Sequence, residues 1–136
     1  MAHFEIEALS FTYPSAKTPS LREVSLKVEP GEYLVLCGKS GSGKTTLLRQ
    51  LKSVLAPHGK KTGTVRFGGV PLDRIDAHEQ AAKIGFVMQN PDDQIVTDKV
   101  WHELAFGLES LGCDQRTMRL RVAEMASYFG ISGWFH

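Results

Sequence analysis

The chain has 136 residues, which is enough for one ordinary domain and too few for two. Hydrophobic residues make up 42% of it and charged residues 23%, the composition of a globular protein. The formal net charge of +1 creates no broad field that would attract nucleic acid, and no segment approaches the roughly 18 apolar residues that cross a bilayer. Cys37 and Cys113 stand too far apart for a metal or redox motif, so we expect Cys37 to be a core residue.

The first third of the chain predicts three strands. Residues 4–13 and 24–28 alternate between apolar and polar side chains, the period-two pattern of half-buried strands, and residues 14–20 form a loop between them. After a turn at residues 30–31, residues 33–37 are apolar throughout and predict a buried strand. This contrast predicts an α/β fold in which an antiparallel layer lies beside a buried parallel core. The apolar positions expected to face the core in the first two strands are Phe4, Ile6, Ala8, Val24, Leu26 and Val28.

The middle of the chain predicts two helices and two further strands. A helix follows residue 43, and an exposed break comes at residues 57–61. A strand and turn are expected at residues 64–70, a short helix at residues 77–83 with Asp76 as its N-cap, and another apolar strand at residues 84–88. The core stripe of the first helix is predicted to comprise Leu47, Leu48, Leu51, Val54 and Leu55.

The last third predicts two helices with apolar stripes at helical spacing. Gly112 is expected to end the first of them, and Asp114 to cap the second. Arg116, Arg119 and Arg121 are expected on the solvated face of the second helix. The first stripe is Val100, Leu104, Leu108 and Leu111, and the second is Met118, Val122, Met125 and Phe129.

One stretch carries a chemical motif, G-x-x-x-x-G-K-[ST], which is the phosphate-binding loop of P-loop NTPases. Such a loop points backbone N–H groups at a phosphate chain, and glycine leaves room for that approach. The preceding apolar strand and the following helix are the context that the motif requires, and a flexible Gly/Ser-rich turn would lack them. The expected nucleotide-binding residues are Gly38, Lys39, Ser40, Gly41, Ser42, Gly43, Lys44, Thr45 and Thr46.

Two side chains of this loop have predicted roles. The Lys44 ammonium is a compact charge for the β- and γ-phosphates. The Thr45 hydroxyl is a ligand for Mg²⁺. The helix that follows directs its positive N-terminal end at the same anion.

Three stretches together resemble the N-terminal half of an ATP-binding-cassette (ABC) ATPase. Residues 10–14 resemble the aromatic A-loop, residues 38–46 match Walker A, and residues 84–94 resemble the Q-loop segment. Within the family the chain is most similar to the ATPase subunits of energy-coupling-factor importers of the cobalt and vitamin type. The Asn-Pro-Asp-Asp-Gln string at residues 90–94 and the run at residues 105–109 carry this narrower resemblance. Met88 stands where that family often has an aromatic residue.

The resemblance implies a binding mode for ATP and Mg²⁺. Tyr13 would stack on adenine, and Gln89 would reach Mg²⁺ through its amide oxygen. Without the resemblance, Tyr13 is interpreted as an aromatic residue packing at a strand end, and Gln89 as a loop glutamine in solvent. Asp92 and Asp93 are most simply solvated turn residues, although the family's loop faces a membrane partner.

The resemblance also implies partners and a location. The intact protein would pair with a second ABC ATPase subunit, identical or paralogous, and with an integral membrane transport subunit, and it would not bind nucleic acid. It would sit peripherally on the cytoplasmic face of the cell membrane. The transported substrate, a vitamin or a metal ion, would be captured by another subunit.

The family's signature motif, Walker B Asp-Glu pair and switch histidine are not found in the sequence. We therefore expect residues 1–136 to be the truncated N-terminal portion of one ABC ATP-binding domain, inactive in hydrolysis by itself. No catalytic set is complete, and Lys44 and Gln89 contribute to it. Two alternatives remain open at this point: a soluble ABC ATPase without a membrane partner, and a nucleotide-binding module that does not hydrolyse.

Overall fold

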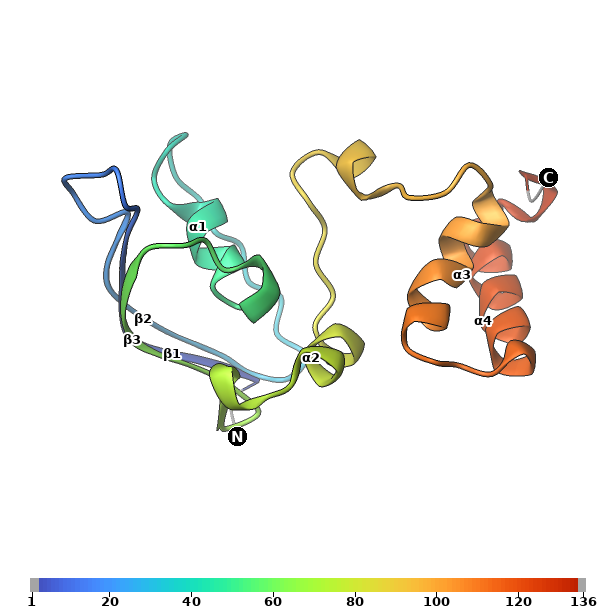
Figure 1. Ribbon diagram of the computed structural model, residues 1–136, viewed down its shortest axis with the longest axis horizontal. Coiled ribbons are helices and arrows are strands. Elements are labelled where there is room, and N and C mark those ends of the chain that lie inside the picture. Colours follow the sequence, from blue (N-terminus) through green and yellow to red (C-terminus); the bar gives the residue numbers. More distant parts are fainter. Residues whose placement is uncertain (1–2, 135–136) are drawn as a thin grey trace. The chain divides into compact units, whose positions relative to one another are not determined.

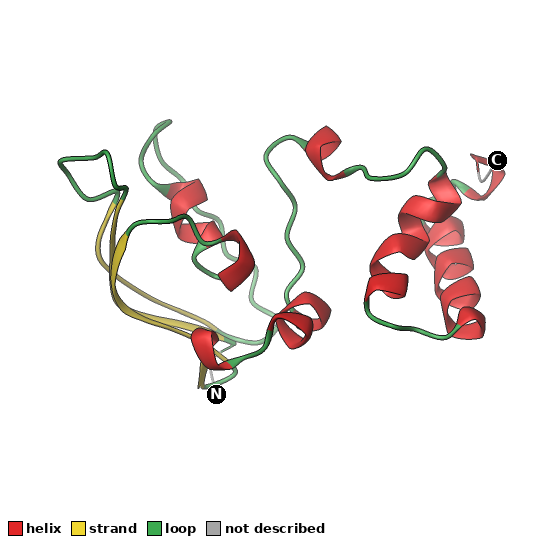
Figure 2. Cartoon of the chain, in the orientation of Figure 1, coloured by secondary structure: helices red, strands yellow, loops and turns green. Residues whose placement is uncertain are grey.

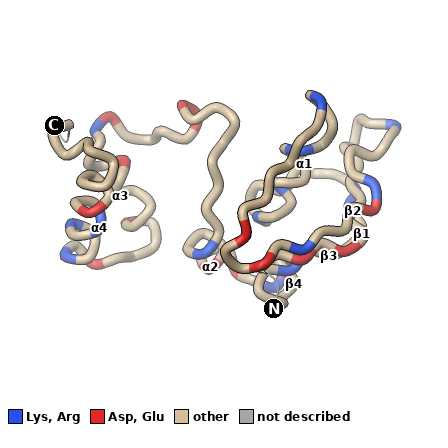
Figure 3. The backbone as a smooth tube through the Cα atoms, turned by 180° about the vertical axis from the view of Figure 1, so that it is seen from behind, with Lys and Arg blue, Asp and Glu red and all other residues tan. Residues whose placement is uncertain are grey.

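A computed structural model describes residues 3–134 of the chain. Contacts divide the chain at residue 80 into two compact units. The first contains a β-sheet with short helices, and the second is helical (Figures 1 and 2). Lys, Arg, Asp and Glu are interspersed along both units (Figure 3). No helix within the described part of the chain is long and apolar enough to span a membrane.

The sheet of the first unit is antiparallel throughout and has the strand order β2-β1-β3-β4. Its strands are β1 (Phe4–Thr12), β2 (Leu21–Val28), β3 (Lys60–Phe67) and β4 (Val70–Pro71). Each strand overlaps a predicted strand or turn, at residues 4–12 of β1, 24–28 of β2, 64–67 of β3 and 70 of β4. The expected exposed break at residues 57–61 is wrong for its last two residues, because β3 begins at Lys60 and pairs with the end of β1.

A bulge changes which face of β1 is buried. Ile6 lies opposite Leu26 of β2 and Val65 of β3, as the alternation predicts. Ala8 was expected to face the core as well, but it is exposed, has a φ of 46°, and lies where both ladders shift register. An extra residue moves every later side chain to the other face, so Leu9 becomes buried instead.

Residues 33–37 do not form the predicted strand. They run extended without strand pairing, and Tyr33 is 92% exposed. Cys37 is exposed too, which corrects its expected place in the core. An apolar segment becomes a strand only when a neighbour takes its backbone hydrogen bonds, and no strand among residues 3–134 pairs with this one. The same holds for residues 84–88, where Ile84 is buried but Val87 is 80% exposed.

The helix after the glycine-rich loop is shorter than its apolar stripe predicts. α1 spans Lys44–Arg49 and is followed, after a turn, by a separate 3-10 helix, Ser53–Leu55. Leu47 is buried in α1, but Val54 is exposed. Leu47, Leu48 and Leu51 line an apolar pocket of about 310 Å³ together with sheet residues such as Ile6. The first half of the stripe therefore faces the sheet, as predicted.

The buried side chain of Gln80 joins the 3-10 helix that follows α1 to the later segment at residues 72–75 by hydrogen bonds. The short 3-10 helix Leu72–Arg74 precedes α2 (Ala77–Lys83), which begins at the predicted N-cap, because the Glu79 N–H donates to Asp76 Oδ1 at 2.8 Å. Gln80 of α2 accepts from the Ser53 N–H at 2.9 Å and donates to the Leu72 and Ile75 carbonyls.

The second unit contains the helical hairpin of α3 (Val100–Ser110) and α4 (Gln115–Tyr128), which lie side by side in Figure 1. A 3-10 helix, Pro91–Gln94, precedes the hairpin, and another, Ser132–Trp134, follows it. Both predicted helices exist.

The ends of the two helices follow the sequence signals. Gly112 adopts a φ of 73°, and the Cys113 N–H reaches back to the Leu108 carbonyl at 3.0 Å, which closes α3 as predicted. Asp114 caps α4 by accepting from the Arg116 and Thr117 N–H groups, both at 3.0 Å.

The predicted stripe of α4 is only partly buried. Val122 is buried, but Met125 and Phe129 are exposed, and Ala126 is buried in their place. The small Ala105 is the buried residue of α3. Small residues at the contact let the two helix backbones approach closely, so the larger apolar side chains point elsewhere. The arginines of α4, Arg116, Arg119 and Arg121, are exposed as expected.

Candidate functional site

The glycine-rich loop, residues 38–43, connects the extended segment 33–37 to α1. Gly41 and Gly43 have φ values of 79° and 94°, a region that other residues rarely adopt. A Cβ on Gly43 would lie 2.6 Å from the Ser20 carbonyl oxygen, and one on Gly38 would lie 2.8 Å from Ser42 Oγ. The positive φ values therefore favour glycine at positions 41 and 43, and the Ser20 carbonyl leaves no room for a Cβ at position 43, whereas at position 38 only the Ser42 side chain would have to move.

The lysine of the motif lies inside the loop. Its Nζ donates to the carbonyl oxygens of Gly38 at 2.7 Å and Lys39 at 2.8 Å, and to Ser42 Oγ at 3.3 Å. An ammonium has three hydrogens to donate, so the loop itself occupies all of them. The binding of phosphate by Lys44 stays a prediction.

The remaining residues of the motif lie around this lysine. Lys39, Ser40 and Thr45 are exposed, and the Ser42 N–H donates to the Lys39 carbonyl at 3.2 Å. Thr46 is buried in α1. An exposed Thr45 next to Lys44 leaves its hydroxyl accessible to a hydrated Mg²⁺.

Tyr13, just beyond the end of β1, contacts the first turn of α1 although the two are far apart in sequence. The Tyr13 and Thr46 hydroxyl oxygens are 3.0 Å apart, a hydrogen bond between the A-loop aromatic and the Walker A motif. The Tyr13 ring also packs edge-on against Phe11, with ring centroids 4.9 Å apart. The structure thus brings the predicted adenine-stacking residue to the predicted phosphate-binding loop. No sequence pattern predicts the hydrogen bond between Tyr13 and Thr46.

Gln89 lies in the second unit and is exposed. Its loop is held by a different glutamine that the sequence patterns did not reveal. Gln94 accepts from the Met88 N–H at 2.6 Å and donates to the Phe86 carbonyl at 3.0 Å, so its amide imitates a neighbouring strand. The role of Gln89 itself remains a prediction.

The predicted turn residues of the same loop are solvated. Asp92 and Asp93 are exposed, and Asp93 accepts from the Asn90 side chain at 3.1 Å. Within the described residues, no group of three or more His, Cys, Asp or Glu side chains lies close enough together to hold a metal ion.

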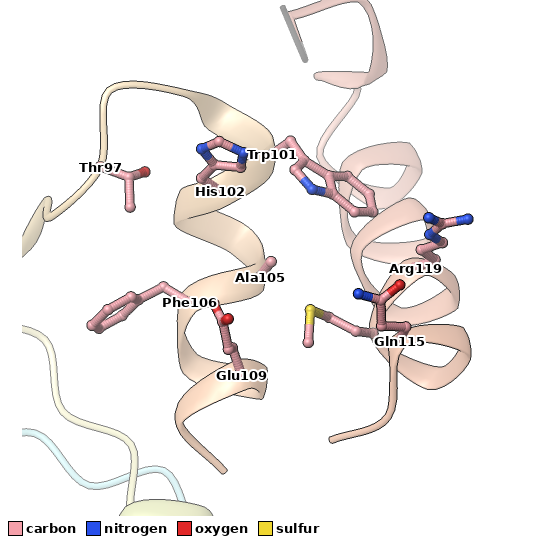
Figure 4. A pocket seen from close by; sticks show the side chains of 9 residues that line it. Thr97, Trp101, His102, Ala105, Phe106, Glu109, Gln115 and Arg119 are labelled. Carbon is pink, nitrogen blue, oxygen red and sulfur yellow. The ribbon is translucent and has the colours of Figure 1, made fainter. Parts of the chain in front are cut away.

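A groove of about 440 Å³ runs along the hairpin of the second unit. Figure 4 shows Trp101 and Ala105 of α3 on one side and Gln115 and Arg119 of α4 on the other. Phe106, 43% exposed, lines it as well. The sequence analysis missed this groove, although Trp101, Ala105 and Glu109 recur every four residues and so share one helix face.

The strand layer, the glycine-rich loop with its lysine, and the short helix behind it are the elements of a P-loop nucleotide-binding protein. A family model described as ABC transporter matches residues 21–134. The energy-coupling factor transporter ATP-binding protein EcfA1 of Lacticaseibacillus paracasei is 40% identical over 129 residues, which cover 95% of this chain and 45% of that protein. A putative ABC transporter ATP-binding protein of Bacillus cereus is 43% identical over all 136 residues, which make up 25% of its length.

A solved structure agrees with these relatives. The structure of cbiO1 from Clostridium perfringens, described as part of the ABC transporter complex cbiONQ, matches 98% of this chain and 53% of that chain with a TM-score of 0.80 and 25% identity. The chain belongs to the ABC transporter family. It spans between a quarter and about half of the length of these relatives.

Proposed function

We propose that the chain is the nucleotide-binding part of an ATPase subunit of an energy-coupling-factor importer. The observation that carries the proposal is the Lys44 ammonium inside a glycine loop whose helix is hydrogen-bonded to Tyr13. A positive charge suited to phosphate and an aromatic face suited to a base occur in the same unit, which supports the proposal. ATP with Mg²⁺ is the ligand that fits both.

Each residue of the site has a definite task in this proposal. Lys44 exchanges its loop carbonyls for phosphate oxygens, and the glycines allow the backbone to approach the phosphate chain. Thr45 supplies an oxygen ligand for Mg²⁺, a cation that prefers oxygen and neutralises phosphate charge, and Gln89 keeps the Mg²⁺-binding role that the resemblance implies. Tyr13 stacks on the adenine ring. Bound Mg²⁺ supplies charge neutralisation on the β- and γ-phosphates.

The intact protein would hydrolyse ATP and couple it to uptake of a vitamin or metal ion. It would work as a dimer of ABC ATPase subunits on the cytoplasmic face of the membrane, bound to an integral membrane subunit. The EcfA1 relative and the described membership of cbiO1 in a transporter complex support these partners. Recovery of the intact protein without any membrane subunit would favour the soluble ABC ATPase instead.

Calorimetric titration of ATP and Mg²⁺ into the 136-residue chain tests the central claim. Lys44→Ala removes charge-assisted contacts worth about 1.5–3 kcal/mol, so ATP affinity should fall about 10- to 100-fold. Lys17→Ala, which removes an exposed lysine from the loop after β1, is the matched control and should bind like the parent chain. Equal affinities of the parent and the Lys44→Ala chain would contradict ATP binding at this loop.

A phosphate-release assay tests the further claim that the 136-residue chain binds ATP without hydrolysing it. We expect no release above background from the chain alone. Turnover that disappears in the Lys44→Ala variant would show that the catalytic groups are already present.

A further inference from the structure

A polar cavity of about 590 Å³ lies in the first unit, away from the glycine-rich loop. Its walls come from the segment after α1, from β3, and from the 3-10 helix Leu72–Arg74. The loop of the nucleotide site precedes Lys44 at the start of α1, whereas Gln50 of this cavity follows the last residue of α1. Nothing in the proposed ATP site uses this cavity.

The charges that line the cavity are mainly positive. Lys61, Arg66 and Arg74 contribute three cations, and Asp73 is the one anion among the lining residues. Arg66 also forms an ion pair with Glu7, whose Oε2 is 3.9 Å from Arg66 Nη2. The three cations still outnumber Asp73 and Glu7, so an anion in the cavity would meet an excess of positive charge.

Lys61 is exposed as a whole residue, but neighbouring protein atoms surround part of its ammonium group. Partial burial lowers the pKa of the Lys61 ammonium, and the charge of Asp73 acts in the opposite direction. An ammonium that has lost part of its hydration gains more from a bound anion than a fully solvated one does. Lys60, its neighbour on β3, does not line the cavity.

An unsatisfied glutamine is the second, independent observation. Gln50 is 1% exposed and lines the cavity, yet neither its Nε2 nor its Oε1 has a hydrogen-bond partner among the described residues. A buried amide without partners is costly, and such groups are usually satisfied by water or a ligand. A ligand that satisfies both atoms must offer one acceptor and one donor, and an oxyanion with an O–H group offers both.

We propose that this cavity binds a small oxyanion that carries a hydroxyl, of the hydrogen-phosphate class, as inorganic phosphate or as a phosphate monoester in its singly protonated form. The anion's oxygens accept from Lys61 and the two arginines. Its O–H donates to Gln50 Oε1, which reaches the cavity by rotation about its side-chain bonds. Sulfate, which has the same shape but no O–H at neutral pH, satisfies the cations and leaves that amide oxygen unpaired.

Calorimetry with inorganic phosphate and with sulfate, at constant ionic strength, tests the proposal. The titrations use the full chain carrying Lys44→Ala, so that the glycine-rich loop does not contribute. We expect one saturable phosphate site and weaker binding of sulfate. Absence of saturable phosphate binding in this chain overturns the proposal, and ATP binding by the parent chain is measured separately.

Three substitutions locate the site, each added to the Lys44→Ala chain. Lys61→Met should lower phosphate affinity about 10-fold, whereas Lys60→Met, on the same strand, should leave it unchanged. Arg74→Met, at an exposed position, should lower phosphate affinity as well. If circular dichroism shows that the Lys61→Met chain does not fold, Arg74→Met replaces it as the test of this cavity. Equal losses in the Lys60 and Lys61 variants overturn the assignment to this cavity.

Gln50→Met isolates the role of the hydroxyl. It should remove the preference for phosphate over sulfate while the cations still bind both anions. A preference that survives in Gln50→Met means that the O–H is recognised elsewhere, which overturns this part of the proposal. A monoester such as glycerol phosphate that competes with phosphate identifies organic phosphates as ligands, and a monoester that is excluded restricts the site to the inorganic ion.

Discussion

The Tyr13 side chain is fixed at both its ring and its hydroxyl. Phe11 packs against the ring edge-on, and Thr46 shares a hydrogen bond with the phenol. Because Thr46 belongs to the first turn of α1, the bond links the expected base-binding residue to the expected phosphate-binding residues. The aromatic face is therefore held in place before any nucleotide arrives, which lowers the ordering cost of binding.

Two substitutions of Tyr13 should separate stacking from positioning. Tyr13→Phe keeps the aromatic face and loses a hydrogen bond worth about 0.5–1.5 kcal/mol, so ATP affinity should fall about 2- to 10-fold. Tyr13→Ala also loses stacking worth about 1–3 kcal/mol and should weaken ATP binding further. Calorimetric titration with ATP and with tripolyphosphate measures both. Tripolyphosphate, which has no base, should bind the parent and Tyr13→Ala chains alike, and equal losses for the two ligands would rule out stacking.

Some residues of the candidate nucleotide site could be predicted from the sequence, but the contacts between them could not. The glycines and Lys44 could be identified because the motif is local, with every member inside nine consecutive residues. The Tyr13–Thr46 bond joins residues 33 positions apart, and Gln94 acts on the backbone of Phe86 and Met88. Such contacts depend on how elements pack, which a motif does not encode.

At the scale of elements, Gln80 holds three short helical segments together. Its Oε1 accepts from the Ser53 N–H, while the two hydrogens of its Nε2 are shared among Ser53 Oγ at 3.0 Å and the Leu72 and Ile75 carbonyls. The residue is buried, so water does not replace these bonds when they are lost. One side chain thus joins α2 to both 3-10 helices of the first unit.

We expect Gln80→Leu to destabilise the first unit. It fills a similar volume but leaves the Ser53 N–H and the Ile75 carbonyl without the partner that Gln80 provides, at a cost of about 1–3 kcal/mol. Urea unfolding followed by circular dichroism measures the change. His78→Ala, at an exposed position on α2, is the control and should change stability by less than about 0.5 kcal/mol. A Gln80→Leu chain as stable as the parent would show that these bonds contribute nothing net.

The cap of α4 gives the second unit a dependence on pH. The side-chain and backbone donors of Thr117 lower the pKa of Asp114 below its usual value of 3.8. Since the folded-state pKa is lowered, the stabilisation is complete above the unfolded-state pKa and is lost as the pH falls through the folded-state pKa.

Asp114→Asn should therefore lose part of the acid sensitivity of α4. The difference in helical circular dichroism between parent and variant in urea should shrink as the pH is lowered below 3.8. Asp98→Asn, which removes an exposed carboxylate that does not cap a helix, is the control. A parent–variant difference that stays constant down to low pH would contradict a role for the ionised cap.

Element types were predictable where the signal is local. The alternation in β1 and β2 and the caps at Asp76 and Asp114 depend on neighbouring residues, and the structure confirms them. The strands predicted at residues 33–37 and 84–88 are wrong because a strand also requires a partner. The burial expected of Ala8 is wrong because a bulge gives no hydrophobic signal.

On the scale of the whole molecule, the apolar surface is large for a chain of this size. Tyr33, Leu34 and Val35 are exposed in an extended segment, and the same segment borders the apolar pocket between α1 and the sheet. An extended apolar segment without a partner offers free N–H and C=O groups as well as hydrophobic side chains. Such a segment is a template for pairing between copies of a chain.

We expect the chain to self-associate through residues 33–37, and two matched valines can show it. Val35 and Val54 are each 63% exposed, but only Val35 lies in the extended segment, whereas Val54 lies in a 3-10 helix. Val35→Lys should place a charge on the free edge and lower light scattering at a given concentration, while Val54→Lys should scatter nearly as the parent does. Equal improvement in both variants would mean that association follows total exposed apolar surface, and the unpaired segment would then have no special part in it.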